Sequence, residues 1–149
     1  MADAITVRDL RADDRARWEE LFRGYIAFYK AEIPNSQYDV TFERLLSDAP
    51  GTHHAFIAVD ENDQPIGLAH VLLHRSTWAP TGYVYLEDLF VNPSVRGGGA
   101  GRALIHATFA FADAQGATRT YWATQDFNAQ ARHLYDQLAT LSPFVQYRR

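Results

Sequence analysis

The stretch from Tyr83 to Ile105 constrains the fold most, because an apolar run, a proline turn, a glycine loop and an amphipathic run follow one another in it. Residues 83–91 are rich in β-branched and aromatic side chains, which predicts a strand. After the loop, residues that predict one face of a helix recur at Leu104, Ile105, Thr108, Phe109 and Ala112. The chain is therefore expected to pass from a strand through a glycine loop directly into a helix.

The loop itself is suited to an anion. Four of the five residues 97–101 are glycine, and Arg96 and Arg102 flank them. Glycine lets a ligand approach backbone N–H groups closely, and the first turn of a helix offers unpaired N–H donors at the positive end of its dipole. The pattern predicts a phosphate-binding loop. The structural alternative is a glycine loop that only connects two elements.

Two common phosphate loops do not fit the sequence. A Walker loop requires Gly-Lys-Ser/Thr, whereas Gly101 is followed by Arg102 and Ala103. A dinucleotide fingerprint requires G-x-G-x-x-G, but its third glycine would fall on Arg102 or on Leu104. The phosphate must belong to another class of ligand.

The remaining pattern is Arg96-x-x-Gly99-x-Gly101, with Val91-x-Pro93 before it. It resembles the Gln/Arg-x-x-Gly-x-Gly/Ala motif that holds the coenzyme A pyrophosphate in the GCN5-related N-acetyltransferases, the GNAT superfamily. The resemblance implies acetyl-CoA as co-substrate. It also implies a pyrophosphate site made of Arg96, Gly97, Gly98, Gly99, Ala100, Gly101 and Arg102.

Glu87 and Asp88 interrupt the otherwise apolar strand, where acidic residues are disfavoured. Adjacent residues of a strand point to opposite faces, which predicts that these two carboxylates do not act as a pair. One should serve a cleft, where desolvation raises a carboxyl pKa and suits the group to accept a proton. The other should have a structural partner, and such a role remains open for Glu87 as well.

The run from Leu86 to Val91 also resembles the GNAT strand whose backbone binds pantetheine and polarises the thioester carbonyl. The resemblance implies that Leu89, Phe90 and Val91 contact the pantetheine. In the polyamine-acetylating branch of the family, the Glu of a Leu-Glu-Asp run is the proposed base, which implies that role for Glu87.

Asn128 and Tyr135 lie seven residues apart, two helical turns, and so face the same way. A helix N-cap would explain Asn128, and half-buried packing would explain Tyr135. The segment from Asn128 to Tyr135 resembles the GNAT pattern N-x-x-A-x-x-x-Y. The resemblance implies that Asn128 contacts the pantetheine and that Tyr135 protonates the departing coenzyme A thiolate.

The acceptor site is less clearly marked. Tyr25 and Tyr29 end an apolar helical stripe just before the break at Pro34, and core packing would explain them. Segments after scaffold elements also tend to carry specificity. We expect an acceptor pocket around Tyr25, Tyr29, Glu87 and Trp122.

The rest of the chain completes an α/β (α+β) fold: a mixed, largely antiparallel sheet, splayed after the glycine-loop strand and flanked by helices. Residues 5–10 alternate as a first strand, and Asp13 or Asp14 can cap the helix that follows. A second short helix precedes a hairpin of strands 54–60 and 66–75, the latter apolar on both faces and therefore central. Residues 119–124 form a parallel strand after the crossover helix, and 141–149 a final edge strand.

Size and composition limit the alternatives. A chain of 149 residues predicts one domain, 1–149. It contains no cysteine, so disulfides and thiolate catalysis are excluded, and the spacing of its six histidines on strands predicts no metal site. A net charge of −4 without a basic block predicts no nucleic-acid partner. No apolar run suggests a membrane span or leader, so a cytoplasmic location is expected.

The region from Tyr121 to Asn128 and the tail 144–149 resemble most the yeast histone, polyamine and D-amino-acid acetyltransferase branch of the GNAT superfamily. The resemblance implies an acetyl-CoA-dependent N-acetyltransferase that acts on a primary amine of a small molecule, of polyamine or amino-acid type. Without a cysteine nucleophile, direct attack within a ternary complex is expected. Two alternatives remain: a protein or histone lysine or N-terminal acetyltransferase, and a non-catalytic acyl-CoA sensor. The predicted edge strand 141–149 would also favour a homodimer.

Overall fold

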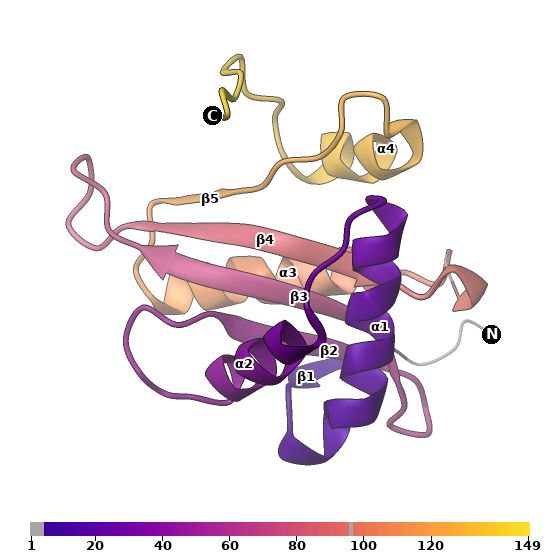
Figure 1. Cartoon of the computed structure of the whole chain (residues 1–149). Coiled ribbons are helices and arrows are strands. Elements are labelled where there is room, and N and C mark those ends of the chain that lie inside the picture. The colour runs from indigo at the N-terminus through magenta and orange to yellow at the C-terminus, as the bar shows by residue number, and fades with distance from the viewer. Residues whose placement is uncertain (1–4, 96) are drawn as a thin grey trace.

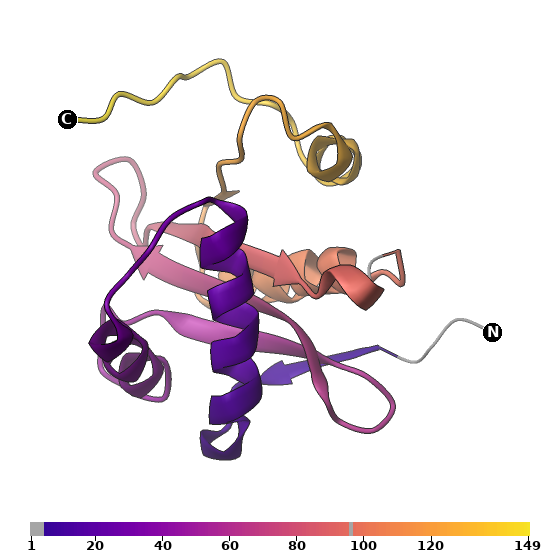
Figure 2. The ribbon, with the colours of Figure 1, turned by 45° about the vertical axis from the view of Figure 1, so that its right-hand side comes forward.

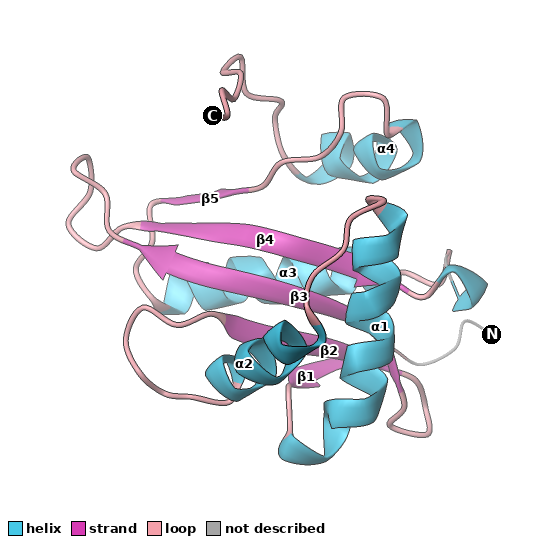
Figure 3. Ribbon diagram, viewed as in Figure 1, coloured by secondary structure: helices cyan, strands magenta, loops and turns pink. Residues whose placement is uncertain are grey.

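The computed structural model describes residues 5–95 and 97–149 and has one five-stranded sheet with helices on both faces (Figures 1 and 3). The strands, in spatial order, are β1 (Thr6–Asp9), β2 (His54–Val59), β3 (Pro65–His74), β4 (Tyr83–Val91) and β5 (Arg119–Tyr121). The first four pair antiparallel, and β5 pairs parallel to β4. The predicted mixed, largely antiparallel sheet is confirmed.

The helices are α1 (Arg15–Phe28), α2 (Asn35–Leu45), α3 (Ala100–Ala114) and α4 (Ala129–Leu138), with short 3₁₀ turns η1 (Ala12–Asp14) and η2 (Pro93–Val95). α1 and α2 lie on one face of the sheet and α3 on the other, while α4 stands beyond β5 (Figures 1 and 2). None of the helices described in residues 5–95 and 97–149 is long and apolar enough to cross a membrane.

Two hydrophobic cores hold these layers together. On the α1–α2 face, Trp18 of α1, Phe42 of α2 and Leu68 of β3 belong to one buried cluster. On the α3 face, Leu104 and Ile105 pack with strand residues in a second. β3 is buried from Pro65 to Val71 because both cores use it, which confirms the prediction that it is central.

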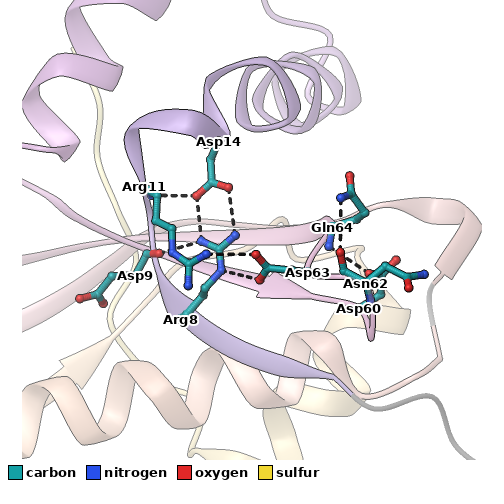
Figure 4. A network of polar contacts seen from close by, with 8 residues as sticks. All are labelled: Arg8, Asp9, Arg11, Asp14, Asp60, Asn62, Asp63 and Gln64. Carbon is teal, nitrogen blue, oxygen red and sulfur yellow. Dashed lines mark hydrogen bonds and ion pairs between the residues drawn. The ribbon is translucent and has the colours of Figure 1, made fainter.

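A polar network anchors the start of α1 to the sheet (Figure 4). The Arg8 guanidinium donates to Asp14 through Nη1 and Nη2, at 2.8 and 3.0 Å, and the Arg11 N–H donates to Asp14 Oδ2 at 2.7 Å. Burial would raise the pKa of Asp14, but these hydrogen bonds outweigh it and hold that pKa below its ordinary value of 3.8. Asp14 occupies the N-cap position of α1, yet its carboxylate makes no capping bond there.

The sheet opens between β4 and β5. The two strands pair only from Tyr83↔Arg119 to Tyr85↔Tyr121, so the second half of β4 runs on without β5 beside it. The predicted splay after the glycine-loop strand is thereby confirmed, although β5 ends at Tyr121 and not at residue 124.

The predicted final strand is wrong. Residues 139–149 form no strand, and Phe144 and Tyr147 are 88% and 94% exposed. After α4 the chain runs away from the sheet (Figure 2), so this tail has no neighbouring strand within the described part of the chain. A strand needs a partner, and alternation in the sequence does not supply one.

Candidate active site

A cavity of about 530 Å³ lies where β4 and β5 part. Its walls come from four elements: the end of α1, the end of β4, the glycine loop with the start of α3, and α4. Most of the residues predicted for the site line it: Tyr25, Tyr29, Leu89, Phe90, Val91, Gly97, Gly99, Ala100, Gly101, Arg102, Asn128 and Tyr135. Segments far apart in the sequence therefore converge on one concave site.

Three predicted residues do not line the cavity. Gly98 belongs to the glycine loop but is turned toward the N-terminal segment of the chain, since a Cβ on it would lie 3.3 Å from Ile5 Cδ1. Glu87 sits further back along β4, and Trp122 packs against Phe109 and Tyr135 on the α3 side of the sheet. Arg96 lies outside the described residues.

The glycine loop presents the N-terminus of α3 to the cavity. Gly97 and Gly99 have φ values of 93° and 88°, a left-handed conformation that favours glycine. Gly99 is the N-cap of α3 and brings no side-chain cap, and no acidic residue stands in the first turn described. The start of α3 thus offers N–H donors and a positive dipole end to an anion, and these features fit a pyrophosphate.

Arg102 connects the loop to the opposite wall. Its Nη2 donates to Oε1 of Gln137 on α4, and both residues line the cavity. This contact holds α4 across from the glycine loop, where its side chains can reach a ligand that extends from the loop.

Tyr135 on α4 is partly buried and packs beside Trp122, with ring centroids 5.4 Å apart. Burial, with a smaller effect of Tyr29, raises the pKa of the Tyr135 hydroxyl to about 12. The hydroxyl is therefore protonated at neutral pH and can donate a proton or a hydrogen bond within the cavity.

Asn128 does what a helix N-cap does: its Oδ1 accepts from the Ala131 N–H at 3.4 Å. The same residue lines the cavity. The structural explanation is thus correct for Asn128, and the predicted contact with pantetheine remains compatible with it because the cap holds the side chain at the cavity wall.

A β-bulge changes the geometry of the two strand carboxylates. β3 and β4 pair as far as His70↔Asp88 and resume at Val71↔Leu86, so Glu87 is an extra residue on β4. Such a bulge breaks the alternation of side chains. The prediction that the two carboxylates point to opposite faces is therefore wrong, and both lie toward the α1–α2 side.

The contacts of Asp88 show this directly. Its Oδ2 lies 2.8 Å from Nδ1 of the buried His70, whose Nε2 lies 3.0 Å from Nε1 of Trp18 on α1. Because the Trp18 N–H is a donor only, His70 Nε2 accepts, and the ring proton sits on Nδ1 facing Asp88. The pKa of the nearby Tyr25 hydroxyl is raised, mainly by burial and to a smaller extent by the negative charge of Asp88.

Glu87 has a different partner. Its Oε1 lies 2.5 Å from Nε2 of His53, in the segment before β2. This hydrogen bond lowers the pKa of Glu87, although partial burial opposes the effect, and it raises the pKa of His53. The Tyr25 hydroxyl donates to the Glu87 carbonyl at 3.4 Å and so connects the pair to the cavity wall.

His53 and His70 were not among the predicted site residues. The expectation that the histidines have structural partners holds for His54, 2.9 Å from Asp9, and for His74, 2.7 Å from the Tyr121 hydroxyl. No local signal distinguishes His53 from its neighbour His54, because its partner is fixed by the bulge in β4. No group of three or more metal-ligating side chains occurs within residues 5–95 and 97–149.

Comparison with known proteins agrees with this site. Residues 18–139 match the Acetyltransferase (GNAT) family. The D-amino-acid N-acetyltransferase HPA3 of Saccharomyces cerevisiae is 32% identical over 147 residues, 99% of this chain and 91% of that protein. The thialysine N-epsilon-acetyltransferase of Caenorhabditis elegans is 34% identical over 97 residues, 64% of this chain and 59% of that protein.

Solved structures agree on the fold. The aminoglycoside N-acetyltransferase AAC(6')-Iy in complex with CoA superposes with a TM-score of 0.79 at 20% identity, over 100% of this chain and 97% of that chain. The ribosomal-protein-alanine N-acetyltransferase of Brucella melitensis gives a TM-score of 0.78 at 20% identity, over 98% and 99%. The family match spans β4, the glycine loop and α4, the elements that build the cavity. The chain belongs to the GNAT family of acetyltransferases and is an N-acetyltransferase.

Proposed function

We propose that the enzyme transfers the acetyl group of acetyl-CoA to a primary amine of a small molecule, of polyamine or amino-acid type. One observation carries the proposal: a single cavity joins an uncapped helix N-terminus at α3 to an aromatic end at Tyr25 and Tyr29, beside two carboxylates. A polyphosphate ligand suits the first end, and a cationic amine suits the second.

Relatives with small-molecule substrates support the choice of acceptor. The yeast and nematode relatives carry the names of D-amino-acid and thialysine acetyltransferases, and both substrates present a primary amine on a small molecule. A cavity of about 530 Å³ is of the size that small ligands occupy in proteins.

The residues present fit a coenzyme A ligand. Gly97, Gly99 and Arg102 would hold the pyrophosphate with the first-turn N–H groups of α3, and Leu89 to Val91 with Asn128 would hold the pantetheine arm. Arg96 and Gly98 remain predictions for the same loop. The co-substrate supplies an activated acetyl thioester when bound.

We propose direct attack by the amine. The acceptor loses a proton on the side of Glu87, where the two carboxylates also attract a cation. The amine nitrogen then bonds to the acetyl carbonyl carbon, the carbon–sulfur bond breaks, and the Tyr135 hydroxyl gives its proton to the departing sulfur. The nitrogen loses its second proton, which restores the Tyr135 hydroxyl through solvent. No cysteine in the sequence offers a thiolate for a covalent acyl-enzyme.

The proposal is tested by measuring coenzyme A binding calorimetrically and thiol release with small amines. Tight binding together with release for a small amine supports it. Tight binding without release for any small amine or peptide would instead favour an acyl-CoA sensor, and release with peptides alone would favour a protein acetyltransferase.

A further inference from the structure

We propose that His53 takes the proton from the acceptor ammonium and that Glu87 orients His53 for this step. The inference rests on the proposed function and divides between two residues the role that Glu87 would otherwise have alone. The two side chains are in direct contact, with His53 Nε2 2.5 Å from Glu87 Oε1.

The hydrogen bond fixes which nitrogen of His53 is available. A carboxylate only accepts, so a neutral His53 must carry its proton on Nε2 to make this contact. The lone pair then sits on Nδ1. Within the described part of the chain, the bond to Glu87 is the one hydrogen bond of the His53 ring, and the side chain is 35% exposed. Neither His53 nor Glu87 lines the cavity, and the pair adjoins its wall at Tyr25, so Nδ1 accepts the proton of the ligand through water.

Glu87 alone is poorly suited to this step. Its carboxylate is already engaged by His53, and the hydrogen bond lowers its pKa, which makes it a weaker base. The same bond raises the pKa of His53. A proton acceptor with a pKa near the working pH is more efficient than one far below it.

The surroundings of the pair are mixed in charge. Asp88 on β4 adds to the effect of Glu87 on His53, and Arg44 at the end of α2 opposes it. His70 on β3 acts on Glu87 in the same direction as His53, although it is hydrogen bonded to Asp88. Asp88 thus stays committed to His70 and does not compete for His53.

Nδ1 of neutral His53 takes one proton from R–NH₃⁺, which leaves R–NH₂ and an imidazolium held by the Glu87 carboxylate. The amine nitrogen attacks the acetyl carbon and the thiolate leaves, protonated by Tyr135. The amide nitrogen then gives its second proton to the tyrosinate through solvent, which restores Tyr135, and the imidazolium of His53 releases its proton to solvent.

The test is the pH profile of kcat/KM for wild type, His53→Gln and Glu87→Gln, with a responsive amine. Wild type should lose activity on the acid side as His53 becomes protonated, at a pKa above its ordinary 6.5. Glu87→Gln should keep measurable activity and move this acid limb to lower pH, because the amide still accepts from Nε2 but carries no charge. His53→Gln should lower kcat/KM about 100-fold at pH 7.5 and remove the limb.

His54→Gln is the matched control. His54 is adjacent in sequence but pairs with Asp9 and stacks on Phe111 at 5.3 Å, on the α3 face. Its replacement should leave kcat/KM and the acid limb unchanged. Melting curves of all variants confirm that they are folded.

A second readout does not depend on turnover. In ¹⁵N-resolved NMR, neutral His53 should be the Nε2–H tautomer, and its pKa should fall in Glu87→Gln. Full activity in His53→Gln together with inactivity of Glu87→Gln would overturn the proposal and leave Glu87 as the base, as would an Nδ1–H tautomer. Wild type that releases no thiol with any amine would overturn the proposed function itself, and this inference with it.

Discussion

Single residues in this enzyme have properties that follow from burial and from one or two contacts. Tyr135 is the clearest case, because burial raises the pKa of its hydroxyl to about 12 while the side chain faces the cavity. A proton donor must be protonated before the step and close to the leaving group, and the first of these conditions is met.

Tyr135→Phe should therefore lower kcat about 100-fold, because it removes the proton donor and little else. The dissociation constant for coenzyme A, measured by calorimetry, should change by less than about threefold, since the ring and its contact with Trp122 remain. Unchanged kcat in Tyr135→Phe would assign protonation of the thiolate to solvent or to another group.

Asp14 provides a test of stability at the same scale. Asp14→Asn should lower the free energy of unfolding by about 3 kcal/mol at pH 7, because it breaks a buried pair with Arg8. The pKa of Asp14 is lowered in the folded state, so its contribution is complete above the ordinary pKa of 3.8 and is lost as pH falls through the folded value. The difference in the free energy of unfolding between wild type and Asp14→Asn, measured by urea denaturation, should become smaller below about pH 3.8.

Asp63→Asn is the control, since Asp63 contacts the same Arg8 but is 55% exposed. Asp63→Asn should lower the free energy of unfolding by less than about 1 kcal/mol. Equal losses in the two variants would contradict the assignment of the stabilisation to the buried pair.

At the scale of elements, the glycine loop and α3 act as a unit. Gly99→Ala should weaken coenzyme A binding, because residue 99 has φ of 88° and a side chain there costs about 1–2 kcal/mol. Relief of that strain would turn the first-turn N–H groups away from the cavity. Calorimetric titration with coenzyme A measures the effect, which should be about tenfold.

Gly101→Ala is the matched variant in the first turn of α3. Gly101 lies within α3, and a Cβ there would stand 3.5 Å from Leu134 Cδ2, an ordinary contact. Binding should stay within about threefold of wild type, since alanine suits a helix better than glycine. Equal weakening in both variants would show that crowding, and not backbone conformation, limits the loop.

Some of these elements follow from local sequence signals, and others depend on pairing between strands. The strand, loop and helix from Tyr83 to Ala114 were predictable because β-branched runs, glycines and helical spacing are local signals. The bulge at Glu87 was not, because it exists only in the register between β4 and β3. The missing strand at 141–149 has the same cause: pairing depends on a neighbour that local alternation does not reveal.

For the candidate site, motif spacing predicted most of the residues that line the cavity. It could not predict which side chains are hydrogen bonded to one another. Trp122 was expected at the acceptor end but packs on the α3 side, because β5 ends at Tyr121 and the chain then turns toward α4. His53 carries no motif and is fixed only by its hydrogen bond to the bulged residue.

At the scale of the whole molecule, we propose that the enzyme is a homodimer in solution. The tail exposes apolar side chains, among them Phe144 and Val145 at 88% and 78%, and the outer edge of the short strand β5 has no neighbouring strand among the described residues. Exposed apolar segments and open strand edges favour association.

Light scattering after size exclusion should give about twice the chain mass of 16.9 kDa for wild type. Phe144→Asp with Val145→Asp should return the mass to that of one chain, while Val40→Asp, on the distant helix α2, should not. A wild-type mass of one chain would contradict the proposal.

The central claim is that one cavity brings an acetyl donor and a small amine together. Its most direct test is acetyl-CoA-dependent thiol release across a panel of polyamines, L- and D-amino acids, aminoglycosides and histone-tail peptides. The protein contributes no thiol of its own, because it contains no cysteine. The account predicts release with at least one class of small amine and loss of that release in Tyr135→Phe. Release with peptides alone, or none with any amine, would contradict it.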